Sequence, residues 1–196
     1  SSQSYLPHEK LDEDDVIDGE SVTYYAKWRT VREVTLNPNG GTLTSFNETI
    51  KYYPDEAGVT LPTAANVTKP NYTFAGWYQK DRDTGELTGE AITEIKQGDR
   101  NDYDLYAKWE PITYKVTLNT NGGTINADDV KKYTYGEGAT LPTDVTKTGY
   151  AFDGWYDNEK CEGTAVTEIG KTETGNKTFY LKWTPNTDTP YTVVHG

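Results

Sequence analysis

The segment YTFAGWY at residues 72–78 returns almost unchanged as YAFDGWY at residues 150–156. Four other motifs recur around it in the same order. VTLN followed by NGGT occupies residues 34–42 and 116–124, and LPT occupies residues 61–63 and 141–143. Ile/Val-Thr-Glu-Ile occupies residues 92–95 and 166–169, and a closing Tyr-x-Lys-Trp occupies residues 106–109 and 180–183. The separation between the copies shrinks along the chain, and the first copy has a longer loop over residues 79–90. Two folded units with different loop lengths explain this drift, and a short solenoid repeat does not.

The repeat divides the 196 residues into four parts, of which residues 30–110 and 111–184 are expected to be two small domains. Residues 1–29 are expected to be a linker plus the end strand of a preceding repeat, because YYAKW at residues 24–28 matches the closing motif. The sequence leaves open whether this part lacks order or lies along an exposed strand edge of the first repeat. Residues 185–196 are expected to be a linker and the start of a further domain. The chain contains no methionine and is expected to be a fragment of a longer protein.

Both repeats are predicted to be mainly β, α+β at most, with little helix. Apolar and polar residues alternate in the closing segments, which is the signature of a half-buried strand. Each repeat opens with a Val-x-Leu strand followed by an Asn-Gly-Gly turn, and a strand followed by this turn motif strongly indicates a hairpin. The partner strands of these hairpins are expected over residues 49–53 and 130–135. No window sustains a period of 3.6 residues, so helix should be scarce.

Matched apolar positions predict the core of each repeat. Large rings are expected to supply much of the burial in small cores, and the chain has 16 Tyr and 5 Trp. Asn and Gly tolerate positive φ, so the turn residues are predicted to be Asn39, Gly40, Gly41, Asn121, Gly122 and Gly123. An alternative for Trp77 and Trp155 is an exposed platform that stacks on sugars, although a repeated ring on a strand usually belongs to the core. The predicted core residues are Trp28, Val34, Leu36, Phe74, Trp77, Leu105, Trp109, Val116, Leu118, Phe152, Trp155, Phe179, Leu181 and Trp183.

Taken together, these motifs resemble the Listeria–Bacteroides repeat, the B-repeat type of internalin B and of many bacterial surface proteins. The resemblance covers about residues 31–109 and 113–183. It implies two tandem small β-grasp (ubiquitin-like) domains, strung between ligand-binding domains and a cell-wall anchor. It therefore implies an extracellular stalk or adhesin segment on a bacterial cell surface, attached to the cell wall in the parent protein.

The chemistry of the side chains argues against an enzyme. Both histidines, His8 and His195, lie outside the repeats, so a Ser-His-Asp or Cys-His site within a repeat is not available. The acidic residues 12–20 fail the calcium-loop spacing, and the single Cys161 gives neither a disulfide nor a metal quartet. The matched Glu94 and Glu168 are read as parts of a solvated strand face. We predict no catalysis, no cofactor and no metal.

Charge and hydropathy limit the kinds of partner that the chain is expected to bind. With a net charge of −12, no basic stripe and no apolar run long enough for a membrane span, the chain is expected to bind neither nucleic acid nor membrane. The expected function is a stalk and weak multivalent interaction unit, because tandem modules raise avidity. Three alternatives stay open: direct recognition of a host protein or glycan, weak homotypic association along exposed strand edges, and an accessory domain of a secreted enzyme.

Overall fold

The computed structural model describes residues 4–7, 24–26 and 28–187, and it divides into two compact units, Ser1–Glu110 and Pro111–Gly196. All regular structure in the described residues is β-strand, without a helix, so the prediction of a mainly β chain is confirmed. His8, the acidic residues 12–20 and the expected start of a further domain at residues 188–196 lie outside the described residues.

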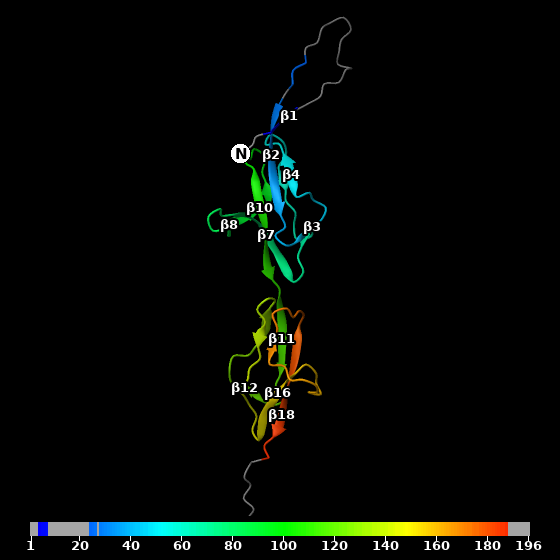
Figure 1. Cartoon of the computed structure of the whole chain (residues 1–196), viewed down its shortest axis with the longest axis vertical. Coiled ribbons are helices and arrows are strands. Elements are labelled where there is room, and N and C mark those ends of the chain that lie inside the picture. Colours follow the sequence, from blue (N-terminus) through cyan, green and yellow to red (C-terminus); the bar gives the residue numbers. More distant parts are fainter. Residues whose placement is uncertain (1–3, 8–23, 27, 188–196) are drawn as a thin grey trace, which may run out of the picture. The chain divides into compact units, whose positions relative to one another are not determined.

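The first unit is built on a six-stranded sheet with the order β1-β2-β10-β7-β8, in which β4 also pairs with β2 (Figure 1). The first and last strands of the repeat, β2 and β10, run parallel to each other, with Val34 opposite Tyr103. Because β10 also pairs with β7, it is hydrogen-bonded along both of its edges. The strands of this sheet are β1 (Ser4–Pro7), β2 (Trp28–Asn37), β4 (Thr49–Tyr52), β7 (Tyr72–Lys80), β8 (Leu87–Ile92) and β10 (Tyr103–Pro111).

Two short ladders complete the first unit. They join β3 (Thr42–Leu43) to β6 (Val67–Thr68) and β5 (Val59–Thr60) to β9 (Glu94–Ile95), both antiparallel. These ladders occupy the connections between the long strands, where the sequence has its turn motifs and its Leu-Pro-Thr segment.

The second unit repeats this plan with four long strands in the order β13-β11-β18-β16. Its first and last strands are again parallel, with Val116 opposite Lys177. Among the described residues of this unit, no strand corresponds to β8, which in Figure 1 projects sideways from the first unit. The long strands are β11 (Thr113–Asn119), β13 (Lys132–Thr134), β16 (Tyr150–Tyr156) and β18 (Lys177–Pro185), and the short ladders pair β12 (Thr124–Ile125) with β15 (Val145–Thr146) and β14 (Ala139–Thr140) with β17 (Glu168–Ile169).

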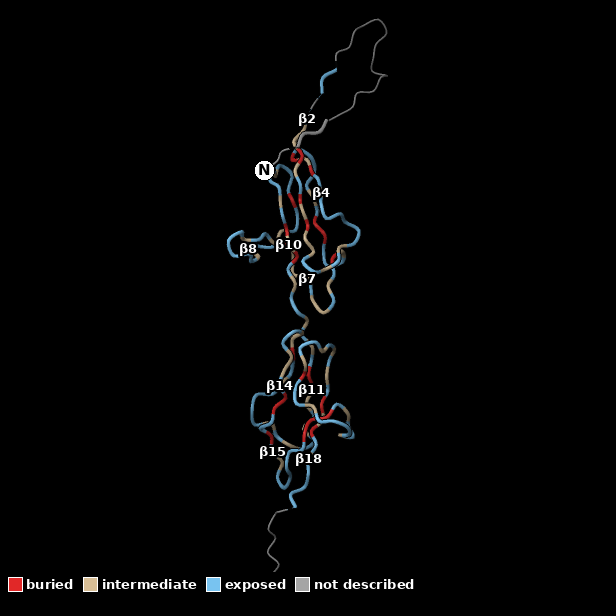
Figure 2. The backbone as a smooth tube through the Cα atoms, viewed as in Figure 1, coloured by how far each residue is buried: buried red, intermediate tan, exposed pale blue. Residues whose placement is uncertain are grey.

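One face of each sheet forms the core, and Figure 2 shows the buried segments along the central strands. The alternation of the closing strand places Leu105 and Ala107 inward in β10, and Phe179 and Leu181 inward in β18. Eight of the predicted core residues are buried: Val34, Leu36, Trp77, Leu105, Val116, Trp155, Phe179 and Leu181. Four more are partly buried and pack against the core: Phe74, Trp109, Leu118 and Trp183.

Two predicted core residues are wrong. Trp28 is 60% exposed at the start of β2, because no glycine turn within the described residues covers its ring. Phe152 is 37% exposed, at a shift in the register of β16 on β18, whereas its counterpart Phe74 contacts the rings of both Trp77 and Trp109. The repeated motif therefore predicts a strand position but not what covers each ring.

The two central tryptophans are core residues and not exposed sugar platforms. Trp77 and Trp155 are each 1% exposed. Their indole N–H groups donate to the carbonyl oxygens of Pro62 at 2.9 Å and Pro142 at 2.8 Å. A buried indole needs such an acceptor, so the Leu-Pro-Thr motif supplies both a buried leucine and the partner of the tryptophan. The core residues that the sequence analysis did not name include Val31, Tyr52, Leu61, Val67, Ile95, Ala107, Tyr133, Leu141, Val145, Tyr156 and Ile169.

The Asn-Gly-Gly segments are turns, and the hairpin prediction is confirmed in both copies, since β4 pairs antiparallel with β2 and β13 pairs antiparallel with β11. Asn39 and Gly40 have φ values of 51° and 88°, and Asn121 and Gly122 have 47° and 89°. The predicted partner strand does pair with the first strand, with Thr35 opposite Thr49. However, the connection between them is long and includes β3, so the turn leads into a ladder with β6 instead of straight back.

Each turn instead holds the closing strand of its own repeat, and we call this contact the closing latch. In the first unit, the indole N–H of Trp109 donates to Pro38 O at 2.9 Å, and the amide of Asn39 donates to Ala107 O at 3.0 Å. In the second, Trp183 donates to Thr120 O at 2.7 Å and Asn121 donates to Leu181 O at 2.7 Å. A Cβ atom at Gly41 or Gly123 would overlap the facing tryptophan ring, so only glycine leaves room for the latch.

Four residues near the N-terminus pair with the first sheet. Residues Ser4–Pro7 form β1, which pairs antiparallel with the start of β2 from Trp28 to Val31. Of the two possibilities that the sequence left open, these four residues therefore lie along a strand of the first unit.

A tyrosine in the second long strand of each unit fastens the loop before the closing strand. The Tyr133 hydroxyl donates to Gly175 O at 2.5 Å, and the Tyr52 hydroxyl donates to Asn101 O in the same way. Burial, together with the Asp99 carboxylate, raises the pKa of Tyr52 to about 12 from an ordinary value of 10.0. The neutral phenol is therefore part of the folded state.

Replacing Gly41 or Gly123 by alanine should destabilise its unit by about 1–3 kcal/mol, because the new methyl group must displace a packed tryptophan ring. Urea unfolding of the full chain measures the change. Gly170→Ala is the control, since a Cβ there meets only the flexible side chain of Glu173, at 3.4 Å. Equal stability of Gly123→Ala and Gly170→Ala would contradict the closing latch.

Alkaline pH should weaken the first unit through Tyr52. The folded state holds the phenol proton more tightly than the unfolded state, so this stabilisation is complete below pH 10 and is lost as the pH rises towards 12. Tyr52→Phe should flatten the fall in unfolding free energy across that window, measured by urea unfolding at several pH values. Tyr25→Phe, at a ring that is 83% exposed, should leave the slope as it is. An unchanged slope in Tyr52→Phe would rule out this linkage.

Candidate functional site

The residues considered for chemistry lie apart from one another. Glu94 and Glu168 are exposed in two short ladders, one in each unit. Cys161 is a half-buried free thiol in the loop after β16, with its Sγ 3.9 Å from Tyr180 O. Within the described residues, no three His, Cys, Asp or Glu side chains are grouped so that they could hold a metal ion. The same part of the chain contains no helix with the length and hydropathy needed to cross a membrane.

One hollow of the first unit depends on its longer loop. The end of β7, the following turn and β8 form a two-stranded arm, residues 79–92, with Gln79 opposite Thr88. The hollow between this arm and β10, which we call the arm groove, is open and polar. Its lining residues are Gln79, Lys80, Asp81, Arg82, Gly85, Thr88, Asp102, Asp104 and Tyr106.

The tip of the arm is held by one carboxylate. Asp81 Oδ1 accepts hydrogen bonds from the backbone N–H of Asp83 at 2.7 Å and of Thr84 at 3.0 Å. These two bonds lower the pKa of Asp81. A backbone bond from Gly85 N to Asp81 O at 2.8 Å closes the same turn. The tip is therefore pre-organised around Asp81 Oδ1.

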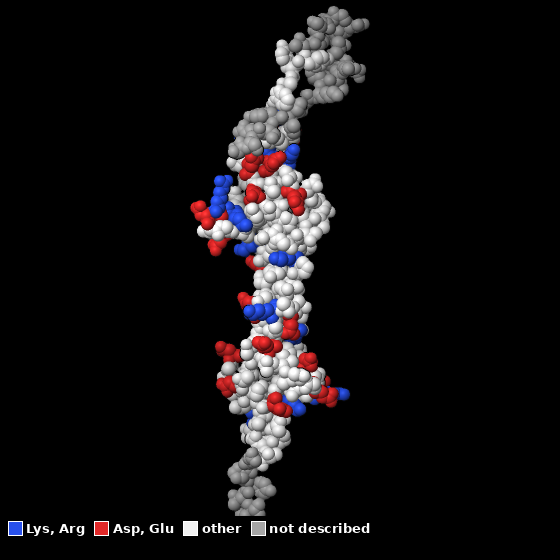
Figure 3. Space-filling model, in the orientation of Figure 1, with Lys and Arg blue, Asp and Glu red and all other residues white. Residues whose placement is uncertain are grey.

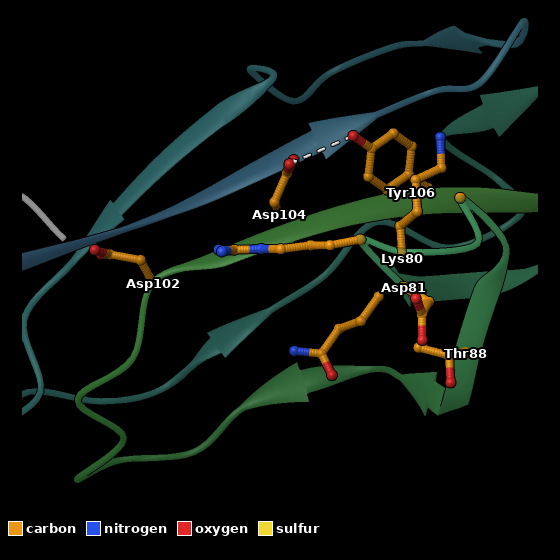
Figure 4. Close-up of a pocket in the computed structure, with 9 residues that line it drawn as sticks. Lys80, Asp81, Thr88, Asp102, Asp104 and Tyr106 are labelled. Atoms are coloured by element: carbon orange, nitrogen blue, oxygen red, sulfur yellow. Dashed lines mark hydrogen bonds between the residues drawn. The ribbon is translucent and has the colours of Figure 1, made fainter.

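The floor of the groove is the outer face of the sheet. Asp104 Oδ1 accepts from the Asn37 amide at 2.6 Å, and Asp104 Oδ2 accepts from the Tyr106 hydroxyl at 3.4 Å. Lys80 Nζ lies 4.3 Å from the centre of the Tyr106 ring. Figure 4 shows Asp104 and Tyr106 on one side of the groove and Asp81 and Thr88 on the other, with Lys80 between them.

Charges of both signs meet at this groove. Lys80 and Arg82 stand against Asp81, Asp102 and Asp104, and Figure 3 shows basic and acidic side chains side by side over the arm. Asp102 also accepts the backbone N–H of Glu33 at 2.9 Å, so it is tied to the sheet. The sequence analysis named none of these residues as a site. Its one signal was the longer loop of the first copy, which does not reveal where the loop lies.

Comparison with known proteins gives the family. The sequence model of the Listeria-Bacteroides repeat domain matches residues 33–108 and 114–182. No solved structure matches the chain.

Relatives in two bacteria share the repeats. The chain is 34% identical over 172 residues, 85% of its length, to a protein described as a Gly-rich membrane protein of Evansella cellulosilytica, covering 18% of it. The chain is also 34% identical over 172 residues, 85% of its length, to a second protein of that organism, described as a membrane protein. The match covers 23% of that second protein. The chain is 37% identical over 136 residues, 67% of its length, to internalin H of Listeria monocytogenes, again covering 23%.

The chain thus spans less than a quarter of the length of each of these relatives. The matched segments cover most of the chain itself. They coincide with the two sheets in which the first and last strands of a repeat are parallel neighbours. The protein therefore belongs to the Listeria-Bacteroides repeat domain family and carries two tandem copies of the repeat.

Proposed function

We propose that this chain is a non-catalytic extracellular module of a bacterial cell-surface protein of the adhesin or internalin type, which acts as a stalk and weak multivalent interaction unit. The observation that carries the proposal is the pair of tandem Listeria-Bacteroides repeats. The names of the relatives, an internalin and two membrane proteins, support a surface location. Attachment to the cell wall in the parent protein is part of the proposal.

The topology of each repeat supports a stalk. Because the first and last strands of a unit are parallel neighbours, the chain enters at one end of the sheet and leaves at the other. A nine-residue strand such as β10 spans about 30 Å at roughly 3.3 Å per residue. Every added repeat therefore extends the reach of a domain beyond it, which an antiparallel arrangement of the two terminal strands would not do.

We propose that both units are β-grasp domains. A mixed sheet whose first and last strands lie parallel at its centre, with the second and third long strands outside them, supports this assignment. The connection between the second and third long strands carries short ladders in place of a helix among the described residues. The assignment therefore rests on the strand order alone.

We also propose that residues 24–28 are the closing strand of a preceding repeat. They have the closing motif, and Tyr24, Tyr25 and Trp28 are the three most exposed large hydrophobic side chains in the described residues. The corresponding Trp109 and Trp183 are covered by the Asn-Gly-Gly turns of their own repeats. An upstream turn would cover Trp28 in the same way.

The stalk proposal predicts two results in the parent protein. An antibody against residues 30–184 should label intact, non-permeabilised cells. Deleting residues 111–184 should reduce attachment by the distal domains, and an unrelated rigid spacer of similar length should restore it, because reach is what the repeat supplies. Loss of attachment from a single exposed substitution in folded repeats would instead identify a recognition module.

A chimera tests the closing strand. Residues 111–178 joined directly to residues 24–110 should fold as two repeats, because residues 24–28 replace the closing strand of the upstream copy. The indole N–H of Trp28, assigned by its loss in Trp28→Phe, should then become protected from exchange with water in NMR spectra. In the control, residues 24–28 are replaced by a Gly-Ser linker, which should leave the upstream segment unfolded. Continued rapid exchange at Trp28 in the chimera would refute the assignment.

A further inference from the structure

The arm groove is a feature of one repeat and goes beyond a spacer role. The second unit keeps the counterpart strands β16 and β18 but, in its described residues, has no second strand on the arm side. An extension needed only for folding would be required in both units, since both build the same core. The arm is therefore not needed to build the core that the two units share.

Several polar groups in the groove have bonding capacity to spare. Within the described part of the chain, the structure gives no hydrogen-bond partner to the side chains of Gln79, Arg82 and Thr88, which are all exposed. Asp104 Oδ2 has only the long contact of 3.4 Å with Tyr106. The groove thus offers donors and acceptors close together, which suits a ligand whose groups both donate and accept.

The charge of the groove favours a neutral ligand. Lys80 and Arg82 in the groove, together with Arg32, which lies 3.9 Å from Asp102, stand opposite Asp81, Asp102 and Asp104. A strongly anionic ligand would meet three carboxylates, and a strongly cationic one would meet three cations. Hydroxyl groups can bond to both kinds without a net charge.

The floor of the groove disfavours an extended peptide. Peptides commonly bind a sheet by adding a strand to an unpaired edge. The floor strand β10 is already paired with both β2 and β7, so its backbone cannot accept another strand. Recognition on the floor of the groove uses side chains, among which the half-buried Tyr106 ring adds an apolar surface beside the polar groups.

From these four observations we infer that the arm groove binds an uncharged, hydroxyl-rich oligosaccharide. Arg82, Gln79 and Thr88 bind hydroxyl groups from the arm, and Asp104 accepts hydroxyl groups from the floor. Tyr106 lies against a sugar face once the flexible Lys80 side chain moves aside. This binding is independent of whether the repeats act as a stalk.

The test uses the full, nitrogen-15-labelled chain in NMR titrations. The probes are cellohexaose, mannohexaose and the hexasaccharide of N-acetylglucosamine, with a heparin hexasaccharide and an uncharged decapeptide as comparisons. At least one neutral sugar should bind with a Kd in the millimolar range or below and shift the backbone signals of Thr88, Asp104 and Tyr106. The corresponding signal of Tyr180 in the second unit should not move.

Two matched variants locate the contact. Tyr106→Ala and Arg82→Ala should each weaken sugar binding about tenfold or more, as expected when a ring contact or a charged hydrogen bond is lost. Tyr180→Ala, at the matching position of the unit without an arm, should bind the sugar as the unchanged chain does. Failure of all three neutral sugars, binding of the charged sugar or the peptide only, or equal weakening by Tyr180→Ala would each overturn the inference.

Discussion

The contact between the closing tryptophan and its Asn-Gly-Gly turn is the constraint on which each repeat depends. Trp109 and Trp183 come from the last strand, while the turns that receive them follow the first strand. The ring needs the empty space at Gly41 or Gly123, and the adjacent asparagine returns a hydrogen bond to the same strand. Almost the whole repeat must therefore be in place before the closing latch forms, so the repeat should fold as a single cooperative unit.

Local patterns in the sequence were sufficient for part of this structure. Alternation alone placed Leu105 and Leu181 in the core, and the Asn-Gly pairs marked positions with positive φ. The hairpin partners were predicted correctly, but the β3–β6 ladder inside the connection was not, because turn residues do not specify what a connection does before its partner strand begins. Trp28 failed because a motif shows that a ring can be buried, whereas burial also needs the surface that covers it. The arm groove was not predictable either, since residues 79–90 show an insertion but not its position over β10.

The two units show how a duplicated fold can carry different surfaces. The core of both relies on the same pairs, such as Trp77 with Pro62 and Trp155 with Pro142. The arm attaches at the end of β7, beyond the last core residue of that strand, and its tip is stabilised internally by Asp81. An insertion placed there leaves the packing of the sheet unchanged, so one copy can gain a groove while the other keeps the plain fold.

Tension on the two ends of either unit would act along the parallel ladder between its first and last strands, β2 with β10 or β11 with β18. In this direction the hydrogen bonds of the ladder share the load and must break together. Terminal strands that were antiparallel neighbours would be pulled apart from one end, and their bonds would break one after another. A unit of this topology therefore resists stretching by shear, and its mechanical strength can exceed what its small core and modest thermodynamic stability suggest.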